Sequence, residues 1–342
     1  MHLFLRSAAV LLAASALMLP VAGGSAEELE IFELAPDYVF GRDRRPTLGY
    51  RKPQVFDPLR DRLYQSGYRN FSPTKVPNEL RNVDALTRMT EMKRMIACAD
   101  AWFWPFSRTA HDHEPKGIDI ELLETIAQKH GWEISIAWVN TGMRFGVGVT
   151  FGNSIDNGIC DIFLGLNITR DDHHMPRHAM EFTAPYMSTG FVLVTQGPAK
   201  GVKSLDQAKA QGVKVGVPAY SPMSDYAEEN GIPYTTFFQN YQVIDGLIRG
   251  DVDAAMLWSG AISQAKLSNP QAEFKMVEGY QPPKEMRWNS AWGIKQSEVE
   301  LKQFLDEAFA EMLKTGETQR IVERYGVPFF PPFEYDDEDA YE

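Results

Sequence analysis

The segment that most constrains the fold runs from residue 160 to residue 194, CDIFLGLNITRDDHHMPRHAMEFTAPYMSTGFVLV. Its apolar residues 162 to 164 are typical of a strand that is buried on both faces of a parallel sheet. A polar loop rich in Asp, His and Arg follows at 167 to 178, and a second apolar strand pattern begins at Phe191. Because ligands bind outside the carboxyl ends of strands in open α/β sheets, this loop is the first candidate for a site.

Strand and helix patterns alternate on both sides of this segment. The patterns before it are a strand at 94 to 99, a helix at 117 to 131, a strand at 132 to 139 and a helix at 144 to 155. The patterns after it are strands at 213 to 217, 234 to 238 and 252 to 257, with helices at 224 to 230 and 243 to 249 between them. Such alternation is the signature of parallel sheets flanked by helices, so the sequence predicts an α/β fold.

The order of these elements predicts two lobes, each a mostly parallel sheet flanked by helices. Residues 94–190 together with 288–333 are expected to form lobe 1, and residues 191–287 to form lobe 2. The segment 286 to 294 is placed to lead the chain back into lobe 1. A long amphipathic helix is expected to close that lobe over residues 298 to 325.

Three segments are expected to lie outside the two lobes. Residues 1–26 carry one basic residue, Arg6, before an apolar run and a group of small residues, which predicts a cleaved signal peptide and export to the periplasm. The run is shorter than the ~20 residues of a membrane span, which disfavours an uncleaved anchor. Residues 27–93 predict an irregular N-terminal arm with a helix candidate at 79 to 90, lying on the main body or contacting a partner, and residues 334–342 predict an acidic tail.

Composition and charge exclude several classes of protein. Of the 342 residues, 44% are hydrophobic and 23% charged, as in a packed globular protein. The formal net charge of −12 argues against nucleic acid or anionic lipid as a partner and favours a cationic partner surface.

The chain has two cysteines, Cys98 and Cys160, in a protein expected to be exported. An oxidising compartment permits a disulfide between them. We expect no such bond, because Cys98 is predicted late in one parallel strand and Cys160 at the start of its neighbour. The rise of ~3.3 Å per residue would then separate their Cα atoms by more than the ~7 Å that a disulfide tolerates.

The order of motifs around the central segment resembles the periplasmic solute-binding proteins of the amino-acid-receptor type. The residues that carry this resemblance are Gly165, Ile168, Thr169, Phe182, Pro185 and Tyr186. The resemblance implies the type II periplasmic binding protein fold, in which two crossover strands join two lobes that close on a ligand.

Two positions depart from what an amino-acid receptor needs. A bound zwitterion requires an Arg fork for its carboxylate and a carboxylate for its ammonium. The family places the Arg three residues after the Ile-Thr pair, where this chain has Asp172, and Arg170 and Arg177 are the nearby alternatives. The family's second-lobe Asp corresponds to Trp258. Because a buried charge without its partner costs ~2–5 kcal/mol, the sequence disfavours ordinary amino-acid binding.

A narrower set of motifs resembles the solute-binding proteins associated with quinoprotein dehydrogenases, the methanol-oxidation J proteins and their relatives. The motifs are Cys98-Ala99-Asp100, Pro105-Phe106-Ser107, Arg144-Phe145, Gly158-x-Cys160-Asp161, Trp258-Ser259-Gly260 and Tyr325-Gly326-Val327-Pro328. In the motif Trp258-Ser259-Gly260, Ser259-Gly260 replaces the family's Gly-Pro. The resemblance implies a non-enzymatic accessory protein whose partners are a pyrroloquinoline-quinone (PQQ) dependent alcohol dehydrogenase and its cytochrome.

The predicted ligand-binding residues combine aromatic side chains with polar residues at strand ends. They are Trp102, Trp104, Thr169, Arg170, Asp172, Arg177, Tyr186, Ser221 and Trp258. Their aromatic members are expected to line an apolar cleft for a hydrophobic ligand or a peptide segment. Phe103 and Phe106 belong to the same aromatic group, but we expect them in the core.

Five histidines lie in two loops that are expected at strand ends: His111, His113, His173, His174 and His178. A solvated polar loop is favoured over a transition-metal site, and no cofactor is expected. No nucleophile is paired with a base in a known motif, so an enzyme is disfavoured. The remaining alternative to the accessory protein is a transporter-linked receptor for a small solute other than an amino acid.

Overall fold

The computed structural model describes residues 83–109, 115–139, 151–168, 180–238, 240–272, 274–283 and 286–334. The expected signal peptide, most of the expected N-terminal arm and most of the acidic tail lie outside these residues.

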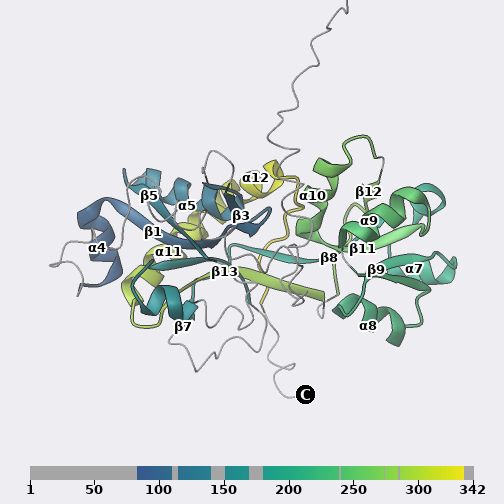
Figure 1. The fold of residues 1–342 in the computed structure, drawn as a ribbon, viewed down its shortest axis with the longest axis horizontal. Helices are drawn as coiled ribbons and strands as arrows, with labels where there is room; N and C mark the ends of the chain where they lie inside the picture. Colours follow the sequence, from purple (N-terminus) through teal and green to yellow (C-terminus); the bar gives the residue numbers. More distant parts are fainter. Residues whose placement is uncertain are drawn as a thin grey trace, which may run out of the picture.

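The strands form one ten-stranded mixed sheet in the order β10-β9-β11-β8-β13-β6-β1-β5, with β12 on β8 and β7 on β13 (Figure 1). The bounds of these strands are β1 Arg94–Asp100, β5 Glu133–Val139, β6 Ile162–Ile168, β7 Met180–Phe182, β8 Met187–Thr195, β9 Val215–Pro218, β10 Tyr234–Phe237, β11 Ala254–Trp258, β12 Lys275–Met276 and β13 Arg287–Lys295. A separate three-stranded sheet contains β2 Trp102–Phe103, β3 Ser107–Thr109 and β4 Pro115–Lys116, where the sequence predicted only an aromatic loop.

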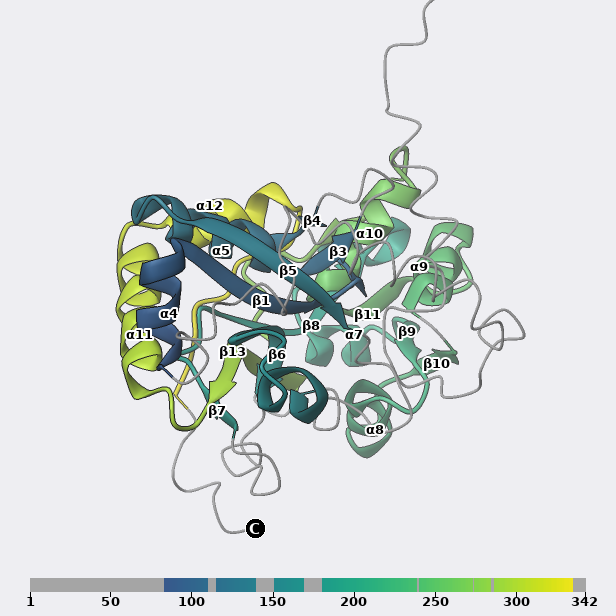
Figure 2. The same ribbon diagram turned by 60° about the vertical axis from the view of Figure 1, so that its left-hand side comes forward.

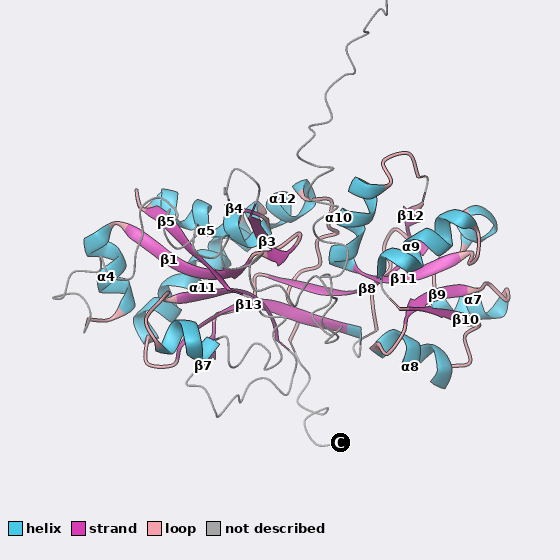
Figure 3. Ribbon diagram, in the orientation of Figure 1, coloured by secondary structure: helices cyan, strands magenta, loops and turns pink. Residues whose placement is uncertain are grey.

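Strands β8 and β13 each extend over nine residues and join the two halves of the sheet. The first part of β8 pairs antiparallel with β13, with Gly190 opposite Arg287, and its second part pairs with β11, with Phe191 opposite Trp258. Lobe 1 is the half around β1, β5 and β6, and lobe 2 is the half around β9, β10 and β11. Figure 3 shows both strands running between the lobes. The predicted α/β fold with two crossover strands is therefore confirmed.

Lobe 1 has helices on both faces of its sheet (Figure 2). They are α4 Ala85–Met92, α5 Ile118–Lys129, the π-helical turn η3 Gly152–Asp156, α11 Val299–Lys314 and α12 Glu317–Arg324. Alternate side chains of β1 serve the two faces: Met95 and Ala97 join the cluster that contains α5 residues, and Ile96 joins the cluster that contains Phe151. The strand reads as continuously apolar because both of its faces are buried.

Lobe 2 repeats this arrangement. Its helices are the 3₁₀ turn η5 Gly197–Gly201, α7 Leu205–Ala210, α8 Pro222–Glu229, α9 Asn240–Arg249 and α10 Ser259–Ser268. Leu193 of β8 packs into the cluster that includes Met223 of α8, and Val192 and Val194 pack into the cluster that includes Val243 of α9. Period-2 alternation thus separates two cores within one strand.

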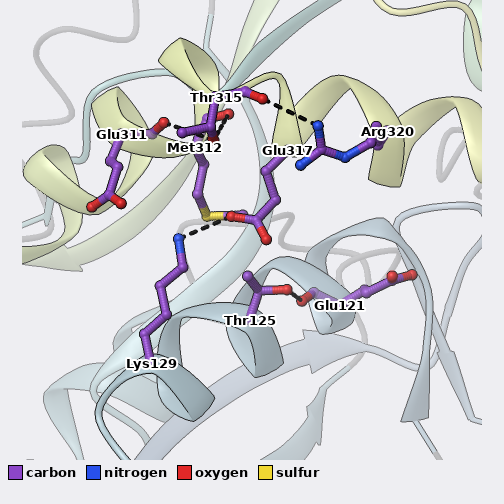
Figure 4. A network of polar contacts seen from close by, with 8 residues as sticks. All are labelled: Glu121, Thr125, Lys129, Glu311, Met312, Thr315, Glu317 and Arg320. Carbon is purple, nitrogen blue, oxygen red and sulfur yellow. Dashed lines mark hydrogen bonds and ion pairs between the residues drawn. The ribbon is translucent and has the colours of Figure 1, made fainter.

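The single long helix predicted over 298 to 325 is wrong, because the chain forms α11 and α12 with a break between them. Gly316 adopts φ +69°, the left-handed conformation that glycine tolerates best. Arg320 Nη1 donates to the carbonyl oxygen of Thr315 at 3.1 Å, and Lys129 Nζ lies 2.9 Å from Glu317 Oε2 (Figure 4). The break lets α12 lie against α5.

Residues 85 to 92 form a helix, as the candidate at 79 to 90 indicated, and it packs into the core of lobe 1 instead of belonging to a separate irregular arm. Ala85 and Met89 of α4 are fully buried in the lobe 1 core. The backbone N–H of Ala85 donates to Glu298 Oε2 at 2.7 Å, and the Arg88 side chain pairs with Asp161. Helix α4 therefore belongs to lobe 1.

The two cysteines form a disulfide, contrary to the expectation from strand spacing. The Cα atoms of Cys98 and Cys160 are 5.6 Å apart. Cys160 precedes β6, which begins at Ile162, so the regular strand rise does not govern its position. The N–H of Asp161 donates to the carbonyl oxygen of Ile96 at 3.0 Å, which holds the chain before β6 beside β1.

Candidate functional site

The candidate site lies where the parallel strands of lobe 2 end against lobe 1. Strand β11 ends at Trp258, which caps the start of α10. The Trp258 side chain is 1% exposed and belongs to the same apolar cluster as the lobe 1 residues Phe106 and Trp292. The carboxyl end of a lobe 2 strand therefore delivers an aromatic ring into the junction, the place at which open α/β sheets bind ligands.

Three aromatic rings from the two lobes stack at this junction. The Trp258 ring centroid lies 5.8 Å from that of Phe103 and 5.7 Å from that of Phe106, with interplanar angles of 15° and 25°. Phe103 and Phe106 are themselves 5.1 Å apart. Aromatic pairs at these distances contribute ~0.5–1.5 kcal/mol each beyond their burial. We call these three residues the junction stack.

Two glycines make room for the junction stack. A Cβ atom on Gly260, in the first turn of α10, would lie 2.3 Å from Cη2 of Trp258. A Cβ atom on Gly165 in β6 would lie 3.1 Å from Cδ1 of Phe103, and Gly165 also has φ +75°. The contact between the lobes is consequently a close-fitting one that larger side chains would disrupt.

A fully buried carboxyl group lies beside Gly165. Asp119, in the first turn of α5, accepts a hydrogen bond from Trp292 Nε1 at 2.8 Å through Oδ1. A Cβ on Gly165 would lie 3.2 Å from Oδ2, and Oδ2 itself has no regular hydrogen bond to the described residues. The Tyr186 hydroxyl lowers the pKa of the same carboxyl, although the two groups do not meet the geometry of a regular hydrogen bond.

The protonation of Asp119 follows from this burial. Removal from water raises the pKa of the carboxyl from 3.8 to about 7, and the donors of Trp292 and Tyr186 oppose that rise. The same burial, with the Asp119 charge nearby, raises the pKa of the Tyr186 hydroxyl well above 10. Burial therefore favours the neutral, protonated form of Asp119 at the base of the junction.

The structure places the aromatic residues predicted for the cleft in different surroundings. We expected Tyr186 to line an open cleft. Instead, it is fully buried in the lobe 1 core, with its ring centroid 5.3 Å from that of Phe309. Trp104 packs edge-on against Tyr325 at 5.5 Å, with the Arg108 guanidinium 4.0 Å from its ring. Trp258 lies between the lobes, and Phe106 is in the core as predicted.

Ser221 stands at the carboxyl end of β9, as expected for a residue at the cleft, but its hydroxyl is already engaged. The Oγ atom accepts from the N–H of Ser224 at 3.3 Å and donates to the carbonyl oxygen of Pro218 at 2.6 Å. Ser221 is therefore the N-cap of α8.

The other predicted site residues lie outside the described part of the chain. They are Thr169, Arg170, Asp172, Arg177 and the histidines His111, His113, His173, His174 and His178, together with the side chain of Trp102. Within the described residues, no group of three or more His, Cys, Asp or Glu side chains is arranged to hold a metal ion.

Sequence reasoning missed Asp119 and Trp292. Acidic residues are common in the first turn of a helix, where they interact favourably with its dipole, so Asp119 looked like part of an ordinary helix start. The signal in the sequence was Gly117, because a glycine directly before a helix can mark a close approach of another chain segment. In the structure, a Cβ atom on Gly117 would lie 2.2 Å from the carbonyl oxygen of Phe106. Close approach of the aromatic loop to α5 is what buries Asp119.

The fold, with two α/β lobes, two crossover strands and a junction at the strand ends, defines a solute-binding protein of the type II class. The match of residues 95–328 to the bacterial extracellular solute-binding proteins, family 3, shows that the chain belongs to that family. No curated protein matches the chain. Among the described residues, no helix is long and apolar enough to cross a membrane.

Solved structures with the same fold include two that are named as a solute receptor or substrate-binding protein and one that is named as a dehydratase. The L-cystine solute receptor of Neisseria gonorrhoeae in its unliganded open conformation has a TM-score of 0.60 at 17% identity, over 73% of this chain and 100% of that one. A polar amino acid uptake transporter substrate-binding protein from Streptococcus thermophilus has a TM-score of 0.58 at 20% identity, over 72% and 91%. An ancestral cyclohexadienyl dehydratase has a TM-score of 0.54 at 16% identity, over 71% and 96%.

Proposed function

We propose that this family member is a non-enzymatic periplasmic accessory protein of a PQQ-dependent methanol or alcohol dehydrogenase system. It uses the solute-binding cleft to bind a segment of the partner or a ligand. The motifs that resemble the dehydrogenase-associated proteins support the partner, because Cys98-Ala99-Asp100 and Tyr325-Gly326-Val327-Pro328 stand in their expected order within the family match. The apparent signal peptide supports the location.

The single observation that carries the proposal is the position of Trp258. An amino-acid receptor needs a carboxylate at the end of this strand to hold an ammonium group. Here the strand ends in an indole that is stacked on Phe103 and Phe106. Because Trp258 is 1% exposed, another molecule reaches these rings only where the lobes part, and a charged group there would lose its water without gaining an ion pair. The surroundings favour an apolar or aromatic group, as a protein segment offers.

The same surroundings argue against catalysis. Asp119 is the acid that an enzyme would use at this junction, since its pKa is about 7. It is fully buried, and its nearest polar neighbours, Trp292 and Tyr186, are hydrogen-bond donors without a nucleophilic role here. One solved relative is named as an ancestral cyclohexadienyl dehydratase. Dehydratase activity should therefore be measured with the purified protein, and the Asp119→Asn variant is the control.

Deletion of the gene tests the proposed function. Activity of the PQQ-dependent alcohol dehydrogenase in periplasmic extracts should fall in the deletion strain and return with the wild-type gene, while an unrelated periplasmic enzyme keeps its activity. The purified protein should also co-elute with the dehydrogenase or with its cytochrome. Unchanged dehydrogenase activity after deletion would contradict the proposal.

The second candidate is a receptor of an ABC transporter for a small solute other than an amino acid. Solved relatives of the same fold are named as amino acid transporter components, which favours it. Calorimetric titration with polar and aromatic solutes, combined with small-angle scattering to follow lobe closure, distinguishes the two candidates. Tight binding of a small solute with closure, and no effect on the dehydrogenase, would favour the receptor.

A further inference from the structure

Tyr220 combines two unusual properties. Its side chain is 88% exposed, more than the other exposed large apolar residues in the described part of the chain. Its φ angle is +56°, in the left-handed region that bulky residues seldom adopt because the Cβ atom crowds the following carbonyl. Glycine would occupy this position without that crowding. Strain of this kind is concentrated at functional positions.

Tyr220 stands at the same edge of lobe 2 as Trp258. Strands β9, β10 and β11 are parallel, so their carboxyl ends share one edge of the sheet. Trp258, at the end of β11, shows that this edge faces lobe 1. Tyr220 follows β9, and Phe238, which is 44% exposed, follows β10. The N–H of Ala219 donates to the carbonyl oxygen of Phe237 at 2.6 Å, which holds the two loops side by side.

The surface beside Phe238 is hollowed, and its lining contains one acidic and one basic side chain. A depression of 440 Å³ lies between the end of β10 and α9, and Phe238, Tyr241 and Asp245 help to line it. Asp225 is exposed in the first turn of α8, directly after the Tyr220 loop. The one cation of the lining, Arg249, is paired with Asp251 at 2.8 Å. Negative charge is thus left beside exposed aromatic rings.

We propose that Tyr220, Phe238 and Tyr241, the lobe 2 rim, dock a segment of the partner protein in which an apolar side chain is flanked by lysine or arginine. The inference rests on the proposed accessory function and names the surface through which it operates. The exposed Tyr220 is suited to anchor an interface, and acidic neighbours steer a basic segment to it. The rim lies at the carboxyl ends of the neighbouring strands β9 and β10, which are ~4.8 Å apart, and at the first turn of α9.

Binding of the purified PQQ-dependent alcohol dehydrogenase to immobilised variants tests this surface. Tyr220→Gly should weaken binding by about tenfold or more, as for an anchor residue. It should not lower Tm, because glycine accepts φ +56°. Asp225→Asn combined with Asp245→Asn should slow association and reduce its dependence on salt. Val299→Ser is the matched control, since Val299 is 64% exposed on α11 of lobe 1 and should leave binding unchanged.

The outcomes separate this inference from the proposed function. If Tyr220→Gly and Phe238→Ser bind the dehydrogenase as tightly as the wild-type protein does, the proposed role of the lobe 2 rim is overturned and the accessory function stands. Absence of any wild-type binding to the dehydrogenase would overturn both. An equal loss in the Val299→Ser control would show a general surface effect and would also count against the rim.

Discussion

Replacement of Gly260 by alanine tests whether the junction stack holds the two lobes together. A Cβ atom at this position would lie 2.3 Å from Cη2 and 2.4 Å from Cζ3 of the Trp258 ring. Carbon atoms in contact are ~3.5–4.0 Å apart, so the ring has to move by roughly 1 Å or more. Phe103 and Phe106 oppose that movement. Because the substitution removes no apolar atom, its effect comes from displacing Trp258.

The expected loss of stability follows from two opposing contributions. Overpacking a filled core costs ~1–3 kcal/mol, and alanine gains up to ~1 kcal/mol over glycine in a helix. A net loss of about 1–2 kcal/mol lowers Tm by roughly 2–4 °C in a protein of this size. Gly201→Ala is the matched control: nothing lies within 4 Å of a Cβ there, so Tm should not fall.

Calorimetry, tryptophan fluorescence and small-angle scattering together check this expectation. A displaced Trp258 should shift the emission to longer wavelength, and parted lobes should raise the radius of gyration. The chain has seven tryptophans, so the same spectrum of Trp258→Phe identifies the contribution of this one. Refutation would be a Gly260→Ala protein whose Tm, emission and radius match those of Gly201→Ala.

Three further outcomes follow from buried polar groups and the disulfide. Burial raises the pKa of Asp119 from 3.8 to about 7, so the free energy of unfolding should be highest below pH 4 and fall by about 4 kcal/mol as pH rises through 7. In Asp119→Asn this fall should be absent when unfolding by urea is measured across pH. An unchanged pH profile in the variant would contradict this. Arg88→Met leaves Asp161 buried without its cation and should cost about 3–5 kcal/mol in the same assay, whereas a cost below 1 kcal/mol would show that the pair is dispensable. Replacing Cys98 and Cys160 by serine opens a loop with a sequence separation of 62 and should cost about 4 kcal/mol at equilibrium, which equal Tm values for the two proteins would refute.

Local patterns in the sequence were sufficient to predict much of the fold. The apolar run before Asp100 predicted β1, and the amphipathic pattern that ends at Gly131 predicted α5. Such elements can be predicted because the burial of each side chain follows the period of its own strand or helix. The crossover at β8 was likewise readable, since both of its faces are apolar.

Elements that depend on distant partners were not readable in the same way. A glycine within a helical pattern costs only ~1 kcal/mol, so Gly316 permits either one helix or two. Packing of α12 on α5, with the Lys129–Glu317 pair, decides for two. The helix candidate at 79 to 90 anticipated α4, but the position of α4 in lobe 1 depends on contacts with Glu298 and Asp161 from elsewhere in the lobe.

For the candidate site, the sequence alone predicted that a tryptophan, Trp258, stands at the end of a lobe 2 strand, where the resemblance to amino-acid receptors implies a charged residue. Only the tertiary structure decided what that tryptophan touches. The crossover strands bring Trp258 onto Phe103, and the approach of the aromatic loop to α5 seals Asp119 from water. Contacts between residues so far apart in the chain depend on how the lobes are joined, and no local period records that arrangement.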